Sequence, residues 1–320
     1  MNIVVLDGNA LNPGDLSWDW LKCFGSAAVY PRTSPEELME RIGSANIILV
    51  NKTPITRGVI QRCPALRLIC VLATGYNVVD CQAAREKNIP VCNVPGYSTA
   101  AVAQFTFALL LELCHQVGHH SSAVHQGRWT SCPDFCFWDT PQMELDGKTM
   151  GIIGFGRIGR AVGRIAKAMG MEVIAYNRSR CPEGEAIGRY VPLEELLARS
   201  DVVSLHCPLT AQTTGLMGTE NIQKMKDGAI LLNTARGGII DEAAVAQALH
   251  SGKLRGAAMD VVSQEPIHGD SLLLTAPNCI ITPHMAWAPV ETRQRIIQIT
   301  SRNIQAFLDG RPQNVVNGIL

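Results

Sequence analysis

Short apolar runs alternate with helical patterns along most of the chain. In the first hundred residues the runs predict strands at 3–6, 47–50, 67–72 and 91–94. Between them, the Ser-Pro-Glu-Glu segment 34–37 has the residues of a helix start, with Ser as the N-cap, Pro at the first helical position and Glu two residues later. Continuous apolar strands separated by helices are typical of a parallel sheet covered on both faces. This part therefore predicts a first, smaller α/β domain.

The same alternation continues through the second, larger part of the chain. Strands are predicted at 150–153, 171–176, 201–205, 229–232, 256–259 and 279–282, and helices at 194–198 and 241–250. Ser98 to Val117 is apolar on most faces and predicts one long buried helix between the domains. His119 to Asp146 lacks clean periodicity but carries several aromatic residues. We expect it to be a loop that packs on the neighbouring domain or on a partner subunit.

A glycine-rich turn links the first of these later strands to an amphipathic helix. The run Gly154-Phe155-Gly156-Arg157-Ile158-Gly159 follows the strand directly, and apolar residues then recur at helical spacing up to residue 169. Gly154 would allow the sharp turn, Gly156 the approach of a pyrophosphate, and Gly159 close packing of helix on strand. The helix N-terminus adds N–H donors and a partial positive charge. The pattern predicts a dinucleotide site, and a merely tight strand–helix turn is the alternative.

The end of the second strand bears on which dinucleotide binds. Sites for NAD usually carry Asp or Glu about 20 residues after the glycines, to bind the ribose. Here the chain reads Asn177-Arg178-Ser179-Arg180, which offers two guanidinium groups and a hydroxyl to a 2′-phosphate. This favours NADP(H), with NAD(H) possible. The alternative is that the arginines belong to a solvated loop.

Three polar side chains follow three of the later strands. Arg236 comes after 229–232, Glu265 after 256–262 and His284 after 279–282, so all are expected at the carboxyl edge of one sheet. Reduction of a ketone by hydride needs a proton donor, which His284 would supply. Glu265 would fix its tautomer and stabilise the imidazolium, and Arg236 would bind a substrate carboxylate and polarise the ketone. Each residue alone could equally be an ordinary loop cation, a solvated turn residue or a satisfied polar group.

Two loops of the first domain also follow strands. One is Asn51-Lys52-Thr53; the other, 73–77, contains Gly75, whose neighbouring N–H groups could hold a carboxylate. A simple left-handed turn at Gly75 explains that loop equally well.

Composition narrows the class of protein. The 320 residues include 28 basic and 28 acidic side chains, which gives no reason to expect a nucleic-acid partner. The 11 cysteines show no framework spacing, so we expect free thiols in the cytoplasm.

No metal site is expected, because Cys132 and Cys136 lack zinc-finger partners and the histidines from His115 to His125 suit a solvated helix end better. The opening MNIVVLDG does not resemble a signal peptide, and the apolar run 105–113 is too short for a membrane span. We expect a soluble protein that does not associate with membranes.

Several motifs together resemble the D-isomer-specific 2-hydroxyacid dehydrogenases. They are LATGYNVVD at 72–80, GFGRIG at 154–159, LHCPLT at 205–210, NTARGG at 233–238, Glu265-Pro266 and PHMAWA at 283–288. Within the family, ATGYN together with NKT at 51–53, and the Trp after His-x-Ala, look most like glycerate dehydrogenases, also called hydroxypyruvate reductases. The resemblance extends from about Ile3 to Pro312.

The resemblance implies an α/β protein of two doubly wound parallel-sheet domains. A Rossmann nucleotide domain, 99–287, would be inserted into a flavodoxin-like substrate domain made of 1–98 and 288–320, with a last helix at 289–309, and the protein would be a homodimer. It would reduce a small 2-keto acid, hydroxypyruvate or glyoxylate, to the D-2-hydroxy acid. Asn177 departs from the Asp of NAD-using members, which puts NAD preference in doubt.

Together with the residues derived above, the resemblance implies three sets of site residues. The catalytic set is Arg236, Glu265 and His284. The cofactor set is Val102, Gly154, Gly156, Arg157, Ile158, Gly159, Asn177, Arg178, Ser179, His206, Pro208, Thr213, Thr234, Ala235 and Asp260. The substrate set is Lys52, Ala73, Thr74, Gly75, Arg236, His284 and Trp287.

Two kinds of alternative stay open. A phosphoglycerate or D-lactate dehydrogenase would share the chemistry, although phosphoglycerate calls for additional cations and often for a regulatory domain. A dinucleotide-sensing corepressor of the same fold would need no turnover, and the intact Arg236, Glu265 and His284 favour an enzyme over it.

Overall fold

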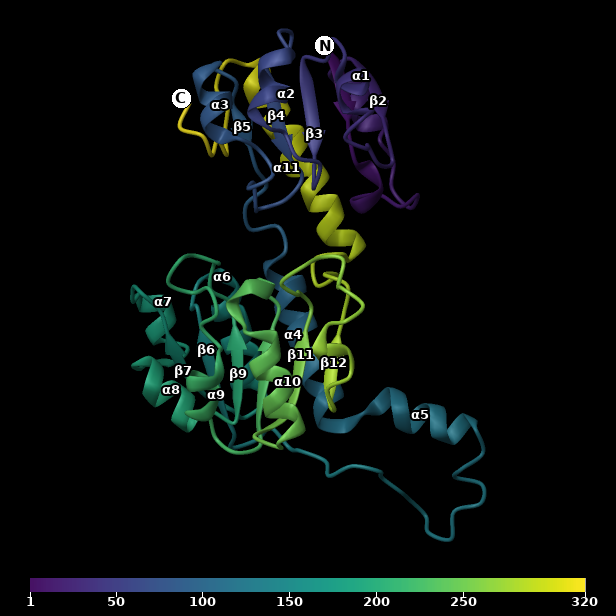
Figure 1. The fold of residues 1–320 in the computed structure, drawn as a ribbon, viewed down its shortest axis with the longest axis vertical. Helices are drawn as coiled ribbons and strands as arrows, with labels where there is room; N and C mark the ends of the chain where they lie inside the picture. The colour runs from purple at the N-terminus through teal and green to yellow at the C-terminus, as the bar shows by residue number, and fades with distance from the viewer. Residues whose placement is uncertain (320) are drawn as a thin grey trace. The chain divides into compact units, whose positions relative to one another are not determined.

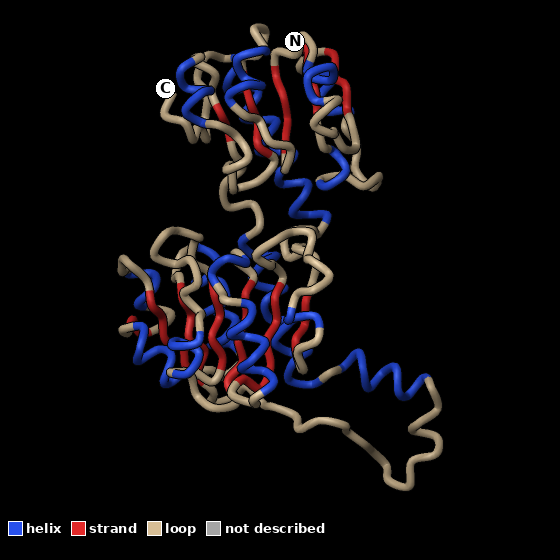
Figure 2. Tube along the Cα trace, in the orientation of Figure 1, coloured by secondary structure: helices blue, strands red, loops and turns tan. Residues whose placement is uncertain are grey.

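The computed structural model describes residues 1–319, and the chain divides into two compact units. Unit 1 comprises Met1–Tyr97 and the chain from Ala288 onward, and unit 2 comprises Ser98–Trp287. Each unit has its own parallel sheet flanked by helices (Figures 1 and 2). Unit 1 is thus assembled from both ends of the chain.

Unit 1 contains a five-stranded sheet in the order β2-β1-β3-β4-β5, with all neighbours parallel. Its strands are β1 (Asn2–Val5), β2 (Ser26–Val29), β3 (Ile47–Val50), β4 (Leu68–Val71) and β5 (Val91–Cys92). This is the flavodoxin-like strand order. The central strands β3 and β4 are buried along their whole length, which explains their unbroken apolar sequences.

The helices of unit 1 are short except for the last one. They are η1 (Gly8–Ala10), η2 (Asp19–Cys23), α1 (Leu38–Ile42), α2 (Arg57–Arg62), α3 (Cys81–Glu86) and α11 (Val290–Leu308). The predicted helix start is present as a reciprocal pair, because Ser34 N donates to Glu37 Oε2 and Glu37 N donates to Ser34 Oγ. Regular α-helix nevertheless begins only at Leu38.

Unit 2 contains a seven-stranded parallel sheet in the order β12-β11-β10-β9-β6-β7-β8. Its strands are β6 (Thr149–Ile153), β7 (Glu172–Tyr176), β8 (Arg189–Tyr190), β9 (Val202–Leu205), β10 (Ala229–Asn233), β11 (Leu254–Met259) and β12 (Cys279–Ile281). The strand order reverses between β6 and β9, where open sheets of this kind bind their ligands. The prediction of two doubly wound α/β domains is confirmed.

Helices cover both faces of this sheet, and each face has its own core. The helices are α4 (Thr99–His115), α5 (Val117–His125), α6 (Arg157–Ala168), α7 (Pro182–Glu185), α8 (Leu193–Arg199), α9 (Thr219–Gln223), α10 (Glu242–His250), η3 (Gly237–Ile239) and η4 (Leu272–Leu274). Val202 and Val203 belong to different core clusters because successive side chains of a strand point to opposite faces.

The predicted helix from Ser98 to Val117 is wrong at its end. Gln116 adopts a left-handed conformation with φ 47° and ψ 48°, which ends α4 at His115. The chain then starts α5, which lies in the segment expected to be a loop, at an angle of 57° to α4. The strands β2 and β8 were also not predicted, because both lie at sheet edges and lack a buried apolar run.

In the described part of the chain, no single helix is long and apolar enough to cross a membrane. The bent pair of α4 and α5 passes that test only when taken together, by length and composition.

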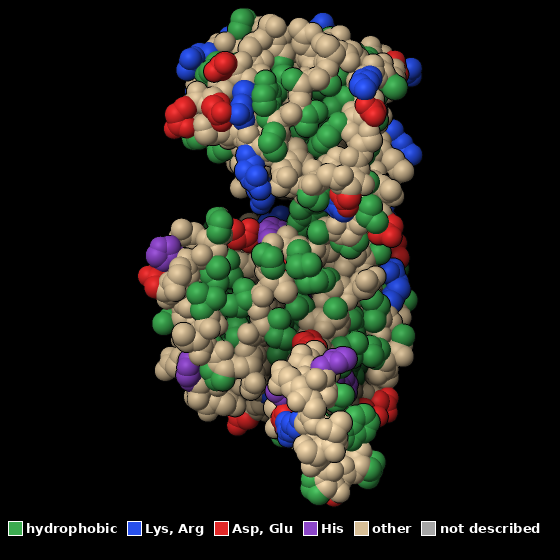
Figure 3. All heavy atoms as spheres, turned by 90° about the vertical axis from the view of Figure 1, so that its right-hand side faces the viewer, with side chains coloured by type: hydrophobic (Ala, Val, Ile, Leu, Met, Phe, Trp, Pro, Cys, Tyr) green, Lys and Arg blue, Asp and Glu red, His purple; other side chains and the backbone are tan. Residues whose placement is uncertain are grey.

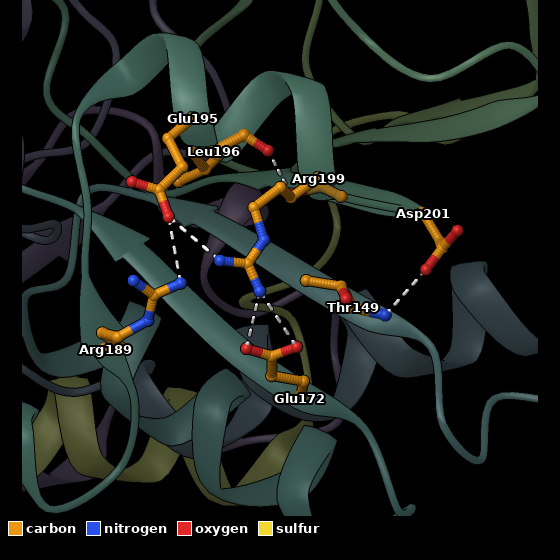
Figure 4. Close-up of polar contacts among 8 residues, drawn as sticks. Thr149, Glu172, Arg189, Glu195, Leu196, Arg199 and Asp201 are labelled. Carbon is orange, nitrogen blue, oxygen red and sulfur yellow. Dashed lines mark hydrogen bonds and ion pairs between the residues drawn. The ribbon is translucent and has the colours of Figure 1, made fainter.

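An ionic network links the amino ends of β7 and β8 to α8 (Figure 4). Arg199 bonds Glu195 at 3.0 Å and Glu172 at 3.2 Å, and Arg189 bonds the same Glu195 at 3.0 Å. These side chains lie on β7, on β8 and on α8. The exposed pairs stabilise little individually, but they occupy the edge opposite the ligand-binding one. That assigns the amino edge a structural role.

Candidate active site

The glycine-rich turn has the shape needed to hold a dinucleotide. Gly154 has a φ of 93°, and a Cβ there would lie 2.3 Å from the backbone nitrogen of Cys207, at the end of the neighbouring β9. A Cβ at Gly156 would meet no atom within 4 Å, so this position faces open space at the start of α6. Open space in front of a helix N-terminus, at the strand-order reversal, fits a bound pyrophosphate. Arg157 and Ile158 begin that helix.

The loop after β7 is tied to this turn by Asn177. Its Oδ1 accepts from Phe155 N at 3.0 Å, and its Nδ2 donates to Ser179 O at 2.7 Å. Arg180 lies over the ring of Tyr190 at 5.8 Å, whereas Arg178 is exposed. The side chain of Asn177 therefore stabilises the loop, and the exposed side chains of Arg178 and Ser179 are the ones that can contact a ligand.

His284 and Glu265, predicted from separate strand ends, are in direct contact. The distance from His284 Nδ1 to Glu265 Oε2 is 2.7 Å. The two side chains are 29% and 32% exposed, so the pair is reachable from solvent. Because the carboxylate accepts from Nδ1, the other ring nitrogen, Nε2, is the one left to serve a substrate.

Asp260 fixes the loop that carries His284. Its carboxylate accepts from Thr282 Oγ1 at 2.7 Å, Met285 N at 2.9 Å and Ala286 N at 2.9 Å, and its carbonyl accepts from His284 N at 2.8 Å. His284 has a φ of 51°, a left-handed conformation that costs a non-glycine residue roughly 1–2 kcal/mol. The buried Asp260 thus holds the backbone of His284 in a left-handed conformation that this residue would rarely adopt alone, and so sets the position of the imidazole.

Arg236 lies at the same sheet edge, on the loop after β10. Its Nη1 donates to the carbonyl of its own neighbour, Ala235, at 2.7 Å. The fully buried Asn233 shapes the loop by accepting from Ala235 N and donating to the carbonyl of Arg236. Gly237 lies so close to Val262 that a Cβ would be 1.9 Å from its carbonyl carbon. The loops of Arg236 and Glu265 are therefore packed against each other through backbone.

The remaining predicted cofactor residues surround the ends of β9 and β10. Thr234 Oγ1 lies 3.1 Å from the hydroxyl of Thr106, which donates to the carbonyl of Val102 on α4. Thr213 donates to the carbonyl of Pro208 at 2.6 Å. These contacts join α4 to the loop after β10 and brace the loop after β9.

His206, at the end of β9, is a neutral imidazole. Desolvation by burial lowers its pKa from 6.5 to about 3. Its Nε2 lies 2.8 Å from Ser204 Oγ. It therefore adds no charge to the carboxyl edge of the unit 2 sheet at neutral pH.

The predicted substrate residues of unit 1 lie on two loops at the carboxyl ends of β3 and β4. Asp7, just after β1, accepts from the backbone nitrogens of Asn51, Lys52 and Thr53 at 2.8, 2.6 and 2.8 Å, and from the Thr53 hydroxyl at 3.1 Å. The structure thus orders the backbone that carries Lys52 and leaves its side chain exposed.

The second loop carries Ala73, Thr74 and Gly75. Thr74 donates through Oγ1 to Val94 O, and its own carbonyl accepts from Asn93 Nδ2, each at 2.8 Å. Trp287 is the last residue of unit 2 and is half-buried.

The histidines at the end of α4 and in α5 make local contacts. His119 Nε2 lies 2.6 Å from Asp139 Oδ2, and His115 Nδ1 lies 2.9 Å from Gln142 Oε1. Within residues 1–319, no three His, Cys, Asp or Glu side chains are grouped so that they could hold a metal ion.

Comparison with known proteins decides the family. The family model for the NAD binding domain of D-isomer specific 2-hydroxyacid dehydrogenases matches residues 107–286. The chain belongs to the D-isomer specific 2-hydroxyacid dehydrogenase family. It is 57% identical to a hydroxypyruvate reductase of Blautia hydrogenotrophica, over 99% of this chain and 100% of that protein. It is 41% identical to a glycerate dehydrogenase of Methylorubrum extorquens, over 88% and 89% of the two chains.

A solved structure has the same fold. An acyclic imino acid reductase in complex with NADPH and D-Arg superposes with a TM-score of 0.84 at 30% identity, covering 99% of this chain and 100% of that one. The protein is therefore an oxidoreductase that uses a nicotinamide dinucleotide to reduce 2-keto acids, as the resemblance implied. When bound, the dinucleotide would supply the hydride, and the residues of the glycine turn and of the strand-end loops of unit 2 would hold it.

Reasoning from the sequence named Asp260 but missed two other carboxylates that organise these loops, Asp7 and Glu242. Asp7 follows a strand directly, so the rule that selected Arg236 and His284 could also have selected it. Glu242, in the first turn of α10, binds the loop after β11 through Ser263, although its position in the sequence suggests only a helix start.

Proposed function

We propose that the protein reduces hydroxypyruvate or glyoxylate to the D-2-hydroxy acid, with His284 as the proton donor. The observation that carries this is the 2.7 Å contact between His284 Nδ1 and Glu265 Oε2 at the carboxyl edge of the sheet that bears the glycine turn. The relatives named hydroxypyruvate reductase and glycerate dehydrogenase support the substrate class.

The residues divide the work of the reaction. Hydride addition to the ketone carbon leaves negative charge on its oxygen, and His284 Nε2 gives that oxygen a proton and becomes neutral. Glu265 stabilises the imidazolium beforehand and fixes which nitrogen faces the substrate. The guanidinium of Arg236 binds the substrate carboxylate in a planar fork and draws charge from the carbonyl. To do this it leaves the carbonyl of Ala235, which is its partner here.

In this proposal the two strand-end loops of unit 1 bind the substrate. Lys52 is a cation for a carboxylate or for a polar substituent, and the backbone around Ala73, Thr74 and Gly75 supplies N–H groups to the carboxylate. Trp287 gives the site an apolar wall. A D-lactate dehydrogenase would share the pair and the arginine, so the substrate itself must be measured.

The cofactor in this proposal is NADPH in preference to NADH. Arg178 and Ser179 are both exposed on the loop that Asn177 ties to the glycine turn, and the loop's own side chains include no carboxylate that would repel a 2′-phosphate. Arg180, over Tyr190, is the lesser contributor. Replacing Arg178 by Ala is expected to raise the KM for NADPH about tenfold or more, and to leave the KM for NADH nearly unchanged. An equal loss for both cofactors would refute the phosphate contact.

The deciding experiment is a steady-state assay with hydroxypyruvate, glyoxylate and pyruvate, each with NADPH and with NADH. The proposal requires the highest kcat/KM for hydroxypyruvate or glyoxylate with NADPH. Preference for pyruvate would favour a D-lactate dehydrogenase, and absence of turnover with all three would favour a dinucleotide-sensing binding protein.

We also propose a cytoplasmic homodimer. In unit 2, α5 and the following loop extend away from the sheet (Figures 1 and 2), and Figure 3 shows hydrophobic side chains along their surface. Trp129, Phe135 and Trp138 are exposed there by 52%, 89% and 64%, an arrangement typical of an interface. The eleven free cysteines suit a reducing compartment. Light scattering after size-exclusion chromatography tests the dimer, and Phe135→Ser with Trp138→Ser should shift it to monomer.

A further inference from the structure

Glu242 makes a set of contacts that its position in the sequence does not require. It is the first residue of α10, and its side chain reaches the loop that follows β11. Its Oε1 accepts from Ser263 N at 2.7 Å and from Ser263 Oγ at 2.6 Å. Its Oε2 accepts from Ser271 Oγ at 3.1 Å. One carboxylate therefore holds both ends of a single loop.

The loop between these two serines carries Glu265. It contains no helix or strand of its own until η4 begins at Leu272. Together with Glu242, the loop lines an open pocket of about 370 Å³, whose lining residues also include Gln264, Ile267 and His268. Ile267 packs against the core of unit 2, and hydrogen bonds to Glu242 fix the two ends of the loop.

The position of Glu265 depends on that path. Its Oε2 must lie 2.7 Å from His284 Nδ1, and misplacement by about 1 Å at a reacting site can cost about 100-fold in rate. His284 has its own brace in Asp260, which holds the loop from Thr282 to Ala286. The two members of the pair are thus each held by a separate internal carboxylate.

We infer that Glu242 is a positioning residue for the reaction, which acts by holding the loop of Glu265 so that this carboxylate meets His284. The inference rests on the proposed roles of Glu265 and His284. Glu242 touches neither of them in the contacts above, so its effect on turnover must pass through the loop.

A second explanation is that Glu242 only supplies negative charge to the N-terminus of α10. Two conservative variants separate the explanations. Glu242→Asp keeps the charge in the first turn but is one methylene shorter, so it cannot span both serines. Glu242→Gln loses the charge but keeps the reach, since its carbonyl can accept from Ser263 and its amide can donate to Ser271 Oγ.

The test measures kcat with hydroxypyruvate and NADPH, and the Kd of NADPH by fluorescence, for the full-length wild type, E242A, E242D, E242Q and E265Q. We expect E242A and E242D to lower kcat about tenfold or more with the Kd of NADPH within about twofold, and E242Q to stay within about threefold of wild type. A normal kcat in E242A would overturn the inference. So would a near-normal kcat in E242D together with a low kcat in E242Q.

A double-mutant cycle covers the case in which E242A also loses stability. If Glu242 acts through Glu265, E242A should lower kcat far less in the E265Q background than in the wild type. Additive effects would mean a general structural role and would overturn the inference. If E265Q itself turns over normally, the proposed role of the pair fails as well, whereas a defective E265Q beside a normal E242A refutes Glu242 alone.

Discussion

The two units use the same architecture for different tasks. Both present loops at the carboxyl ends of a parallel sheet, and in both an internal carboxylate organises them: Asp7 in unit 1, and Asp260 with Glu242 in unit 2. All 8 histidines of the sequence fall within unit 2, and none falls in unit 1. The edge of unit 2 therefore offers an imidazole, whereas the edge of unit 1 offers ordered backbone and a lysine. We interpret unit 1 as recognising the substrate and unit 2 as performing the reaction.

The largest effect should come from the imidazole of unit 2. His284→Ala removes the proton donor and is expected to lower kcat by about 10²–10⁴-fold, with the Kd of NADPH nearly unchanged. Stopped-flow and steady-state rates measure the loss, and fluorescence titration measures the binding. A kcat near that of the wild type would show that the donor lies elsewhere, and the contrast between the units would then disappear.

A smaller loss is expected at the guanidinium of unit 2. Arg236→Lys keeps the positive charge but replaces a planar fork by a point charge, so one charge-assisted hydrogen bond is lost. We expect kcat/KM for the keto acid to fall about 10- to 100-fold. Retained activity in this variant would mean that charge alone suffices at this position.

In unit 1 the corresponding change should affect recognition and leave the chemical step intact. Asp7→Ala leaves the N–H groups of Asn51, Lys52 and Thr53 without their acceptor and loosens the Lys52 loop. We expect the KM for the keto acid to rise about tenfold, with kcat and the Kd of NADPH largely kept. If kcat falls while KM holds, unit 1 takes part in the reaction itself.

The smallest effect concerns stability in acid. The pKa of His206 in the folded protein is lowered to about 3 by burial, so the unfolded chain binds a proton below pH 6.5 that the folded chain does not bind. The free energy of unfolding of unit 2 should therefore fall as the pH drops from 6.5 toward 3, by at most about 1.4 kcal/mol per pH unit for this group.

Calorimetry at about pH 7 and about pH 5 measures this dependence. His206→Asn should flatten it in the transition of unit 2, and the transition of unit 1, which has no histidine, serves as the internal control. An unchanged dependence in the variant would assign the acid sensitivity to other groups.

Much of the site followed from one rule, that polar residues placed after buried strands of a parallel sheet meet at one edge. The rule selected His284 and Glu265, which the structure brings to 2.7 Å. It did not select Asp7, although this residue also follows a strand, because the sequence shows no partner that would give this carboxylate a role, as His284 does for Glu265. The rule also could not predict the conformation of the Arg236 side chain, which donates to the carbonyl of Ala235 in its own loop.

The sequence by itself determined the fold class, the glycine turn and the strand ends that carry the proposed catalytic side chains, because these follow from apolar periodicity and from local backbone requirements. The tertiary structure alone decided the contacts that brace these loops. Glu242 and Ser263 are 21 residues apart, and Asp7 and Lys52 are 45 apart. Such contacts depend on loop conformations and sheet order, which no local pattern of residues specifies. The bend at Gln116 was likewise hidden, because a left-handed residue inside an apolar helical pattern leaves that pattern almost unchanged.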